Sequence, residues 1–250
     1  MLQLIGIILI SCLLIWFFTK GNLTVLGLTP TTERLKYFLI LFIVSSIISA
    51  SSFLLRMYIA EEVYVLTPSL TISSVLLETW YQFRSVLTEE LICRGALLYI
   101  LIKKAGQTKA IVITSLFFAV LHWFNAGVWG NLTQMIIIFT FTFAMGLLLA
   151  FSYAKTYSIL IPFAIHFGWN LTQNYIFPDT ANGNHIFKLA IPTRKINNNF
   201  MPLLTGSVQP EFHGLAFSHH EKLAVSGRPL FECHYSFRFF IPKNYSLFHT

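Results

Sequence analysis

The side chains most able to do chemistry in this sequence are ionisable or amide groups that stand inside long apolar stretches. They are Glu89, Glu90, Arg94, His122, His166 and Asn170. A charged side chain at the centre of a bilayer costs about 2.5–3.5 kcal/mol even on a lenient insertion scale. Residues kept in such a place against that cost are functional candidates by default.

Helical spacing relates the members of each stretch. Glu90 and Arg94 are four residues apart, so they share one face of a helix and can neutralise each other. Glu89 is turned by about 100° from Glu90 and can point into a cavity instead. His166 and Asn170 are also four residues apart and present an imidazole and an amide side by side. The spacing therefore predicts a supporting ion pair and two helix faces that can contribute to a site.

The apolar stretches that contain Glu89, His122 and His166 place these residues at similar depths in the membrane. Counted from the lysine that marks the end of its helix, Glu89 lies 14 residues in, His122 lies 13 and His166 lies 11. At 1.5 Å per residue, these depths are about 21, 20 and 16 Å. A single histidine on a helix is usually a satisfied core residue, but side chains from separate helices at nearly one level favour a shared site.

This set of side chains suits hydrolysis of a peptide bond by water. A glutamate shielded from bulk water is a competent general base, and a neighbouring histidine can orient the water or donate a proton. An imidazole and a carboxamide can both stabilise the oxyanion of a tetrahedral intermediate. Cys93 is one turn from Glu89, where the carboxylate disfavours a thiolate, so a cysteine nucleophile is not indicated.

The composition indicates a membrane environment. Hydrophobic residues make up 55% of the 250-residue chain, charged residues only 11%, and the mean hydropathy is +0.66. A soluble domain has roughly 25% charged residues. The net charge of +7 does not indicate nucleic acid, because the basic residues lie in short loops and in the tail. The many phenylalanines are interpreted as lipid-facing bulk. The sequence thus predicts a multi-pass protein of the cell membrane, with the lipid bilayer as a partner.

The predicted fold is all-α, a polytopic membrane bundle of about six transmembrane helices. The hydrophobic segments are expected at about 2–18, 37–58, 70–102, 110–123, 132–153 and 158–177. The third is too long for one perpendicular span, so membrane entry is expected from Val86 onward. The catalytic candidates fall on the third, fourth and sixth segments. Residues 1–69 hold two helices, 70–177 the catalytic core, and 178–250 an atypical basic tail of irregular structure.

Positive charge predicts the orientation. With six alternating spans, the basic residues of the short loops fall on one side of the membrane: Lys20, Arg34, Lys36, Lys103, Lys104, Lys109 and Lys155. The positive-inside rule makes that side cytoplasmic. The tail carries more basic residues on the opposite side, but long segments count for less in this rule.

Three motifs on successive predicted helices resemble those of a known family. They are Glu89-Glu90-x-x-x-Arg94, Phe118-x-x-x-His122 and His166-x-x-x-Asn170. Their order and spacing are similar to those of the CAAX prenyl endopeptidase and bacteriocin-processing family, also called the CPBP or Abi family of intramembrane proteases. The resemblance covers about residues 70–174. The tail departs from the family pattern, because no further apolar helix follows.

The resemblance implies a role for each motif residue. Glu89 would be the general base that activates water, and His122 would assist it. His166 and Asn170 would form the oxyanion site. The supporting ion pair would be Glu90 with Arg94.

The resemblance leaves the use of a metal open. The family is often labelled metalloprotease, and a carboxylate with two imidazoles is a reasonable ligand set for zinc. Its mechanism is nevertheless commonly described as metal-free, and the spacing here matches no strong zinc signature such as His-Glu-x-x-His. No cofactor is therefore expected, with zinc as the alternative.

The function expected from these residues is that of an intramembrane endopeptidase acting on a membrane-embedded or lipidated peptide or protein. Processing would be of the CAAX type or, in a bacterial cell membrane, bacteriocin or pheromone maturation or self-immunity. The alternative is a non-enzymatic membrane immunity or scaffold protein of the same fold. A transporter with Glu89 and His122 as a proton relay is disfavoured, because the sequence has no repeated halves.

Overall fold

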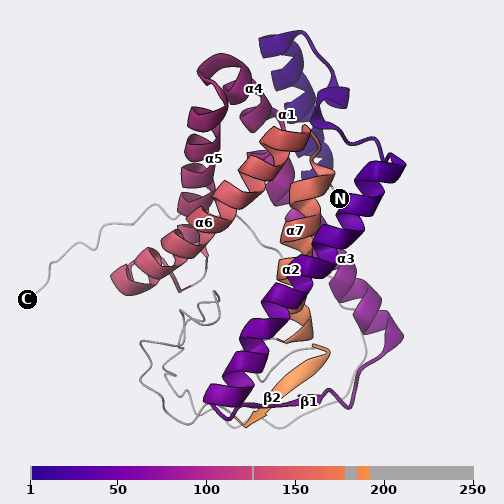
Figure 1. Cartoon of the computed structure of the whole chain (residues 1–250), viewed down its shortest axis with the longest axis vertical. Coiled ribbons are helices and arrows are strands. Elements are labelled where there is room, and N and C mark those ends of the chain that lie inside the picture. Colours follow the sequence, from indigo (N-terminus) through magenta and orange to yellow (C-terminus); the bar gives the residue numbers. More distant parts are fainter. Residues whose placement is uncertain (1, 126, 178–184, 192–250) are drawn as a thin grey trace, which may run out of the picture. The chain divides into compact units, whose positions relative to one another are not determined.

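The computed structural model describes residues 2–125, 127–177 and 185–191, which are mostly helical (Figure 1). The α-helices are α1 Leu2–Thr19, α2 Thr32–Ile59, α3 Ile72–Cys93, α4 Ala96–Ala105, α5 Gln107–Leu121, α6 Leu132–Thr156 and α7 Leu160–Leu171. Shorter helical turns are η1 Leu23–Leu26, η2 His122–Phe124 and η3 Thr172–Ile176. The chain divides into the units Met1–Glu211 and Phe212–Thr250, and all described residues belong to the first.

Among the described residues, three helical segments are long and apolar enough to cross a membrane. They are α2, α6 and the segment Gln107–Phe124, which joins α5 to η2. Many apolar side chains of α2 point outward: Leu39, Ile47 and Leu54 are 57, 62 and 61% exposed. Continuous apolar surface of this kind is suited to lipid rather than to water. The membrane assignment is therefore supported by the fold, whereas the count of six spans stays a prediction.

The third predicted segment is broken rather than continuous. Helix α3 ends at Cys93 and α4 begins at Ala96, with Arg94 and Gly95 between them. A Cβ on Gly95 would lie 2.2 Å from the carbonyl oxygen of Leu91, so this turn requires glycine. The break thus follows the glutamates directly and sets the direction of α4 independently of α3.

Helix α7 lies alongside α2 (Figure 1). Gly168 makes the approach possible, because a Cβ there would lie 2.3 Å from the hydroxyl oxygen of Ser45 and 2.5 Å from the carbonyl oxygen of Phe42. The Ser46 hydroxyl donates a hydrogen bond to the Gly168 carbonyl at 3.2 Å. Small and hydroxyl-bearing residues are the usual means by which membrane helices come close. This contact fixes the helix that carries the second histidine of the predicted site.

A two-stranded antiparallel sheet lies near the end of α2. Strand β1 (Val63–Leu66) pairs with β2 (Phe187–Ile191), so that Tyr64 stands opposite Leu189. Nearby, Arg56 and Glu62 form a buried ion pair with a nitrogen–oxygen distance of 2.8 Å. The sheet is an addition to the expected all-α fold, and β2 gives regular structure to part of the tail that was expected to be irregular. The tail beyond residue 191 lies outside the described residues.

Candidate active site

Three helices carry the predicted site residues. Helix α3 begins with a capping box at Thr71 and carries Glu89 and Glu90 in its last turns. His122 stands at the C-terminal cap of α5, and His166 lies within α7. The carboxylates therefore come from one helix and the imidazoles from two others.

Glu90 is the centre of a buried polar group. Its Oε1 accepts hydrogen bonds from Arg94 Nη1 at 3.1 Å and from His166 Nδ1 at 2.7 Å. The side chains of Glu90 and Arg94 are 0% exposed, and that of His166 is 4% exposed. Removing one member of a buried ion pair typically costs about 3–5 kcal/mol. The ion pair expected from the spacing is present, and it also holds the imidazole of α7.

The contact with Glu90 determines which nitrogen of His166 is left for chemistry. An ionised carboxylate accepts but cannot donate, so Nδ1 carries a proton and Nε2 is directed away from Glu90. Nε2 lies 3.8 Å from Oε2 of Glu89, which is longer than a hydrogen bond. In the neutral ring Nε2 is an acceptor, and only the doubly protonated ring donates from it.

Glu89 has a different environment from its neighbour Glu90. Its side chain is 33% exposed, and its Oε1 accepts a hydrogen bond from the Ser85 hydroxyl at 3.4 Å. Its Oε2 is buried and has no hydrogen-bond partner among the described residues. A buried acceptor without a partner is uncommon in folded proteins and is often found where a water or a reacting group binds.

Phe118 connects His122 to the buried group of Glu90, Arg94 and His166. The interpretation of the phenylalanines as lipid-facing bulk missed this role. The buried ring of Phe118 lies 4.1 Å from Cζ of Arg94, and its centroid is 4.4 Å from that of His122 and 5.7 Å from that of His166. The Nδ1 of His122 donates to the Phe118 carbonyl at 2.8 Å, which leaves Nε2 as the acceptor in the neutral ring. His122 also lies within electrostatic range of Glu89. The four-residue spacing of Phe118 and His122 was the signal available in the sequence.

Asn170 is the predicted site residue that the structure does not connect to the others. It lies one turn after His166 on α7 and is half-buried. Its side chain forms no hydrogen bond with any residue in the described part of the chain. Its role at an oxyanion stays a prediction.

The same donors bear on the question of a metal ion. Among the described residues, no three His, Cys, Asp or Glu side chains form a group that could hold a metal ion. Nδ1 of His166 and Nδ1 of His122 are held by Glu90 and by a backbone carbonyl, which leaves Nε2 of both rings and Oε2 of Glu89 for other contacts. A zinc centre needs at least three protein ligands around one point. The absence of a cofactor therefore stays a prediction, with zinc as the alternative.

The fold and the site together define a class, a membrane-embedded helical protein with a buried carboxylate–imidazole group. Residues 71–172 match the family described as type II CAAX prenyl endopeptidase Rce1-like. This range contains all of the predicted site residues, and the resemblance to the CPBP or Abi family is confirmed. Through this segment the chain is similar to a family of CAAX-type proteases. No curated protein and no solved structure matches the chain significantly.

Proposed function

We propose that this chain is an intramembrane endopeptidase in which Glu89 activates water without a metal ion. The observation that supports this most is the pairing of His166 with Glu90, which leaves Nε2 of the imidazole 3.8 Å from the Glu89 carboxylate. Two polar groups at that separation can both form hydrogen bonds with one water molecule. The family match over residues 71–172 supports a peptidase of the CAAX type.

In the proposed reaction Glu89 takes a proton from water while the water oxygen attacks the carbonyl carbon of the peptide bond. The carbonyl oxygen becomes an oxyanion, to which doubly protonated His166 donates from Nε2. Asn170, one helical turn further along α7, would supply a second donor. The intermediate collapses when the carbon–nitrogen bond breaks, and the leaving amine takes the proton that Glu89 had accepted.

His122 is proposed to orient the attacking water. Its Nδ1 is held by the Phe118 carbonyl, so Nε2 of the neutral ring can accept a hydrogen bond from that water. Arg94 and Glu90 do not meet the substrate in this proposal. They hold His166 in the orientation that the reaction needs.

The substrate is proposed to be a membrane-embedded or lipidated peptide or protein of the cell membrane. Such a substrate brings its scissile bond to the depth at which Glu89 and His166 lie. CAAX-type processing is the expectation from the family. In a bacterial cell, maturation of a bacteriocin or pheromone precursor, or self-immunity, would use the same chemistry.

The variant Glu89→Gln tests the proposal, because it keeps the size of the side chain and an acceptor for Ser85 but cannot take a proton. In proteoliposomes that contain a fluorogenic membrane peptide, we expect cleavage to fall about 100-fold or more, as is typical for loss of a general base. Wild-type cleavage is expected to continue in the presence of a chelator. Glu78→Gln, the same change on the same helix outside the site, is the matched control and should retain activity.

Two outcomes would contradict the proposal. Full cleavage by inserted Glu89→Gln and His122→Ala proteins would show that the base is assigned wrongly. If the wild-type chain cleaves nothing, and its phenotype in a host survives both substitutions, a non-enzymatic immunity or scaffold protein of the same fold is the better explanation. Thermal unfolding of each variant in the same liposomes separates a chemical loss from a folding defect.

A further inference from the structure

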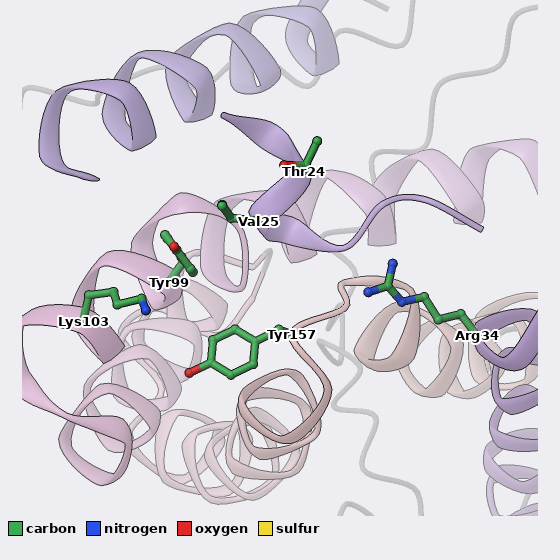
Figure 2. Close-up of a pocket in the computed structure, with 6 residues that line it drawn as sticks. All are labelled: Thr24, Val25, Arg34, Tyr99, Lys103 and Tyr157. Atoms are coloured by element: carbon green, nitrogen blue, oxygen red, sulfur yellow. The ribbon is translucent and has the colours of Figure 1, made fainter. Parts of the chain in front are cut away.

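A pocket of about 460 Å³ lies near the end of the bundle at which α2 begins (Figure 2). Its walls come from η1, the first turn of α2, α4 and the turn between α6 and α7. It contains none of the predicted catalytic residues. The residues that line it are Thr24, Val25, Arg34, Tyr99, Lys103 and Tyr157.

The chemistry of this lining is that of an anion site. Arg34 and Lys103 supply two positive charges from different sides of the pocket (Figure 2). Neither forms an ion pair with any residue that the structure describes. The hydroxyl groups of Tyr99 and Tyr157 add hydrogen-bond donors, whereas the Thr24 hydroxyl donates to the Asn22 side chain. No carboxylate of the described residues lines the pocket. Cations and hydroxyls without a competing acid favour a ligand with several anionic oxygens.

Hydrogen bonds join two of the turns that form the pocket. The Ser158 hydroxyl donates to the Gly27 carbonyl at 2.9 Å, and the Ile159 N–H donates to the Leu26 carbonyl at 2.9 Å. Gly27 has a φ of +61°, and a Cβ there would lie 2.2 Å from the Tyr157 carbonyl oxygen. The turn after η1 is thus locked onto the turn between α6 and α7, next to Tyr157. The pocket is open to its surroundings, and these contacts fix the two turns on one side of it.

The position of the pocket indicates a lipid rather than a soluble anion. Arg34 stands in the first turn of α2, a helix long and apolar enough to span a membrane. Leu35 and Leu39 follow on the same helix and are 47 and 57% exposed, so apolar surface begins directly below the cation. This is also the side on which the basic loop residues are expected. Basic pockets between membrane helices on the cytoplasmic side are a recurrent form of anionic-lipid site.

We propose that this pocket binds the phosphate of an anionic phospholipid headgroup through Arg34 and Lys103. The hydroxyl groups of Tyr99 and Tyr157 donate hydrogen bonds to the remaining headgroup oxygens. The acyl chains of the lipid lie along the exposed apolar face of α2. The proposal does not depend on peptidase activity.

The test measures lipid binding by the full chain in neutral detergent. Phosphatidylglycerol, phosphatidylcholine and free glycerol 3-phosphate are titrated separately, with the bound lipid followed by native mass spectrometry and by the thermal unfolding midpoint. We expect phosphatidylglycerol to bind in preference to the other two. The double variant Arg34→Gln/Lys103→Gln should weaken its binding by about tenfold or more, as expected for two basic residues at a membrane surface.

The matched control is Lys36→Gln/Lys109→Gln, which removes the same charge from exposed positions that do not line the pocket. This pair should bind phosphatidylglycerol as the wild type does. The single variant Lys103→Gln, at an exposed side chain, gives the same comparison if the double variant folds poorly. Equal losses in the pocket and control pairs, or equal binding of both phospholipids, would overturn the proposal. Equally tight binding of free glycerol 3-phosphate would overturn the assignment to a lipid and identify a soluble phosphate instead.

Discussion

Phe118 lies between the buried guanidinium of Arg94 and the two imidazoles of the candidate site. A guanidinium over an aromatic face gains about 0.5–2 kcal/mol, and most where water is excluded. Nε and Nη2 of Arg94 have no hydrogen-bond partner among the described residues. The ring of Phe118 therefore supplies part of the stabilisation that hydrogen bonds usually give a buried cation.

This contact predicts a catalytic defect in Phe118→Leu. Leucine keeps the apolar bulk but removes the aromatic face, so Arg94 and the imidazoles that contact the ring lose their common support. We expect kcat in the proteoliposome assay to fall by about tenfold, within the range of a buried cation–aromatic contact. KM should change little, because Phe118 contacts side chains of the site rather than the substrate.

The matched control is Phe117→Leu. Phe117 is the neighbouring residue on α5 and is 40% exposed, so its loss should leave kcat unchanged. A fall in kcat of the same size in both variants would mean that the defect comes from α5 as a whole. A change confined to KM would place Phe118 at the substrate instead.

At the scale of single residues, the sequence predicted side-chain contacts within one helix better than side-chain contacts between two helices. The four-residue spacing of Glu90 and Arg94 was sufficient to predict their ion pair, because that distance is set by helix geometry. The bond from His166 to the same carboxylate joins residues on α7 and α3. It depends on how these two helices cross, which residue spacing does not specify.

At the scale of elements, the contact between α2 and α7 positions the histidine of α7. Gly168 lies two residues after His166, and the space of its missing side chain is filled by Ser45 and the Phe42 carbonyl. The second contact is with backbone, which cannot rotate away. Any added side chain must therefore push the two helices apart.

We expect Gly168→Ala to lower the stability of the folded chain by about 1–3 kcal/mol, the usual cost of overpacking. The shift of α7 should also reduce peptide cleavage. Thermal unfolding in detergent and the cleavage assay measure the two effects on one preparation.

Gly6→Ala is the control for Gly168→Ala. Gly6 lies within α1, and a Cβ there would meet no atom within 4 Å, so the substitution should leave stability unchanged or raise it slightly. An unfolding midpoint for Gly168→Ala at or above that of the wild type would show that α2 and α7 are not in the close contact described.

The break between α3 and α4 shows what hydropathy alone cannot locate. Residues directly on both sides of the break are apolar, so the segment 70–102 reads as one stretch. Its excess length and the polar residues of its first part, such as Glu78 and Arg84, indicated a change of environment but not a break at this point. The position of the break is decided by the backbone at Gly95, which approaches the Leu91 carbonyl too closely for any side chain. One glycine among apolar residues is a weak signal in a sequence.

For the molecule as a whole, runs of apolar residues predicted most of the helices, because spanning a bilayer requires a run of that length. The small sheet was not predicted. Its strands, Val63–Leu66 and Phe187–Ile191, are far apart in the sequence, and neither is long enough to be distinguished from a loop. Pairing at such a separation depends on where the intervening helices bring the chain back.

Charge on the connecting loops predicts the orientation of the whole molecule. Lys104, at the end of α4, belongs to the set of basic residues expected in the cytoplasm, and Trp129 lies in the uncharged loop before α6. Between them lies one segment that is long and apolar enough to span, Gln107–Phe124. The two loops should therefore face opposite sides of the membrane.

Cysteine labelling measures this directly. In a background without the native cysteines, Trp129→Cys should react with an impermeant maleimide in intact cells, and Lys104→Cys should react only after the membrane is opened. Both positions are exposed, so a failure to react reports the membrane rather than burial. The reverse pattern would invert the orientation and place the pocket of Arg34 and Lys103 outside the cell, away from the leaflet in which anionic lipid attracts basic residues. Reaction of both positions on one side would show that Gln107–Phe124 does not cross the membrane. The prediction that His122 lies at the same membrane depth as Glu89 would then be wrong.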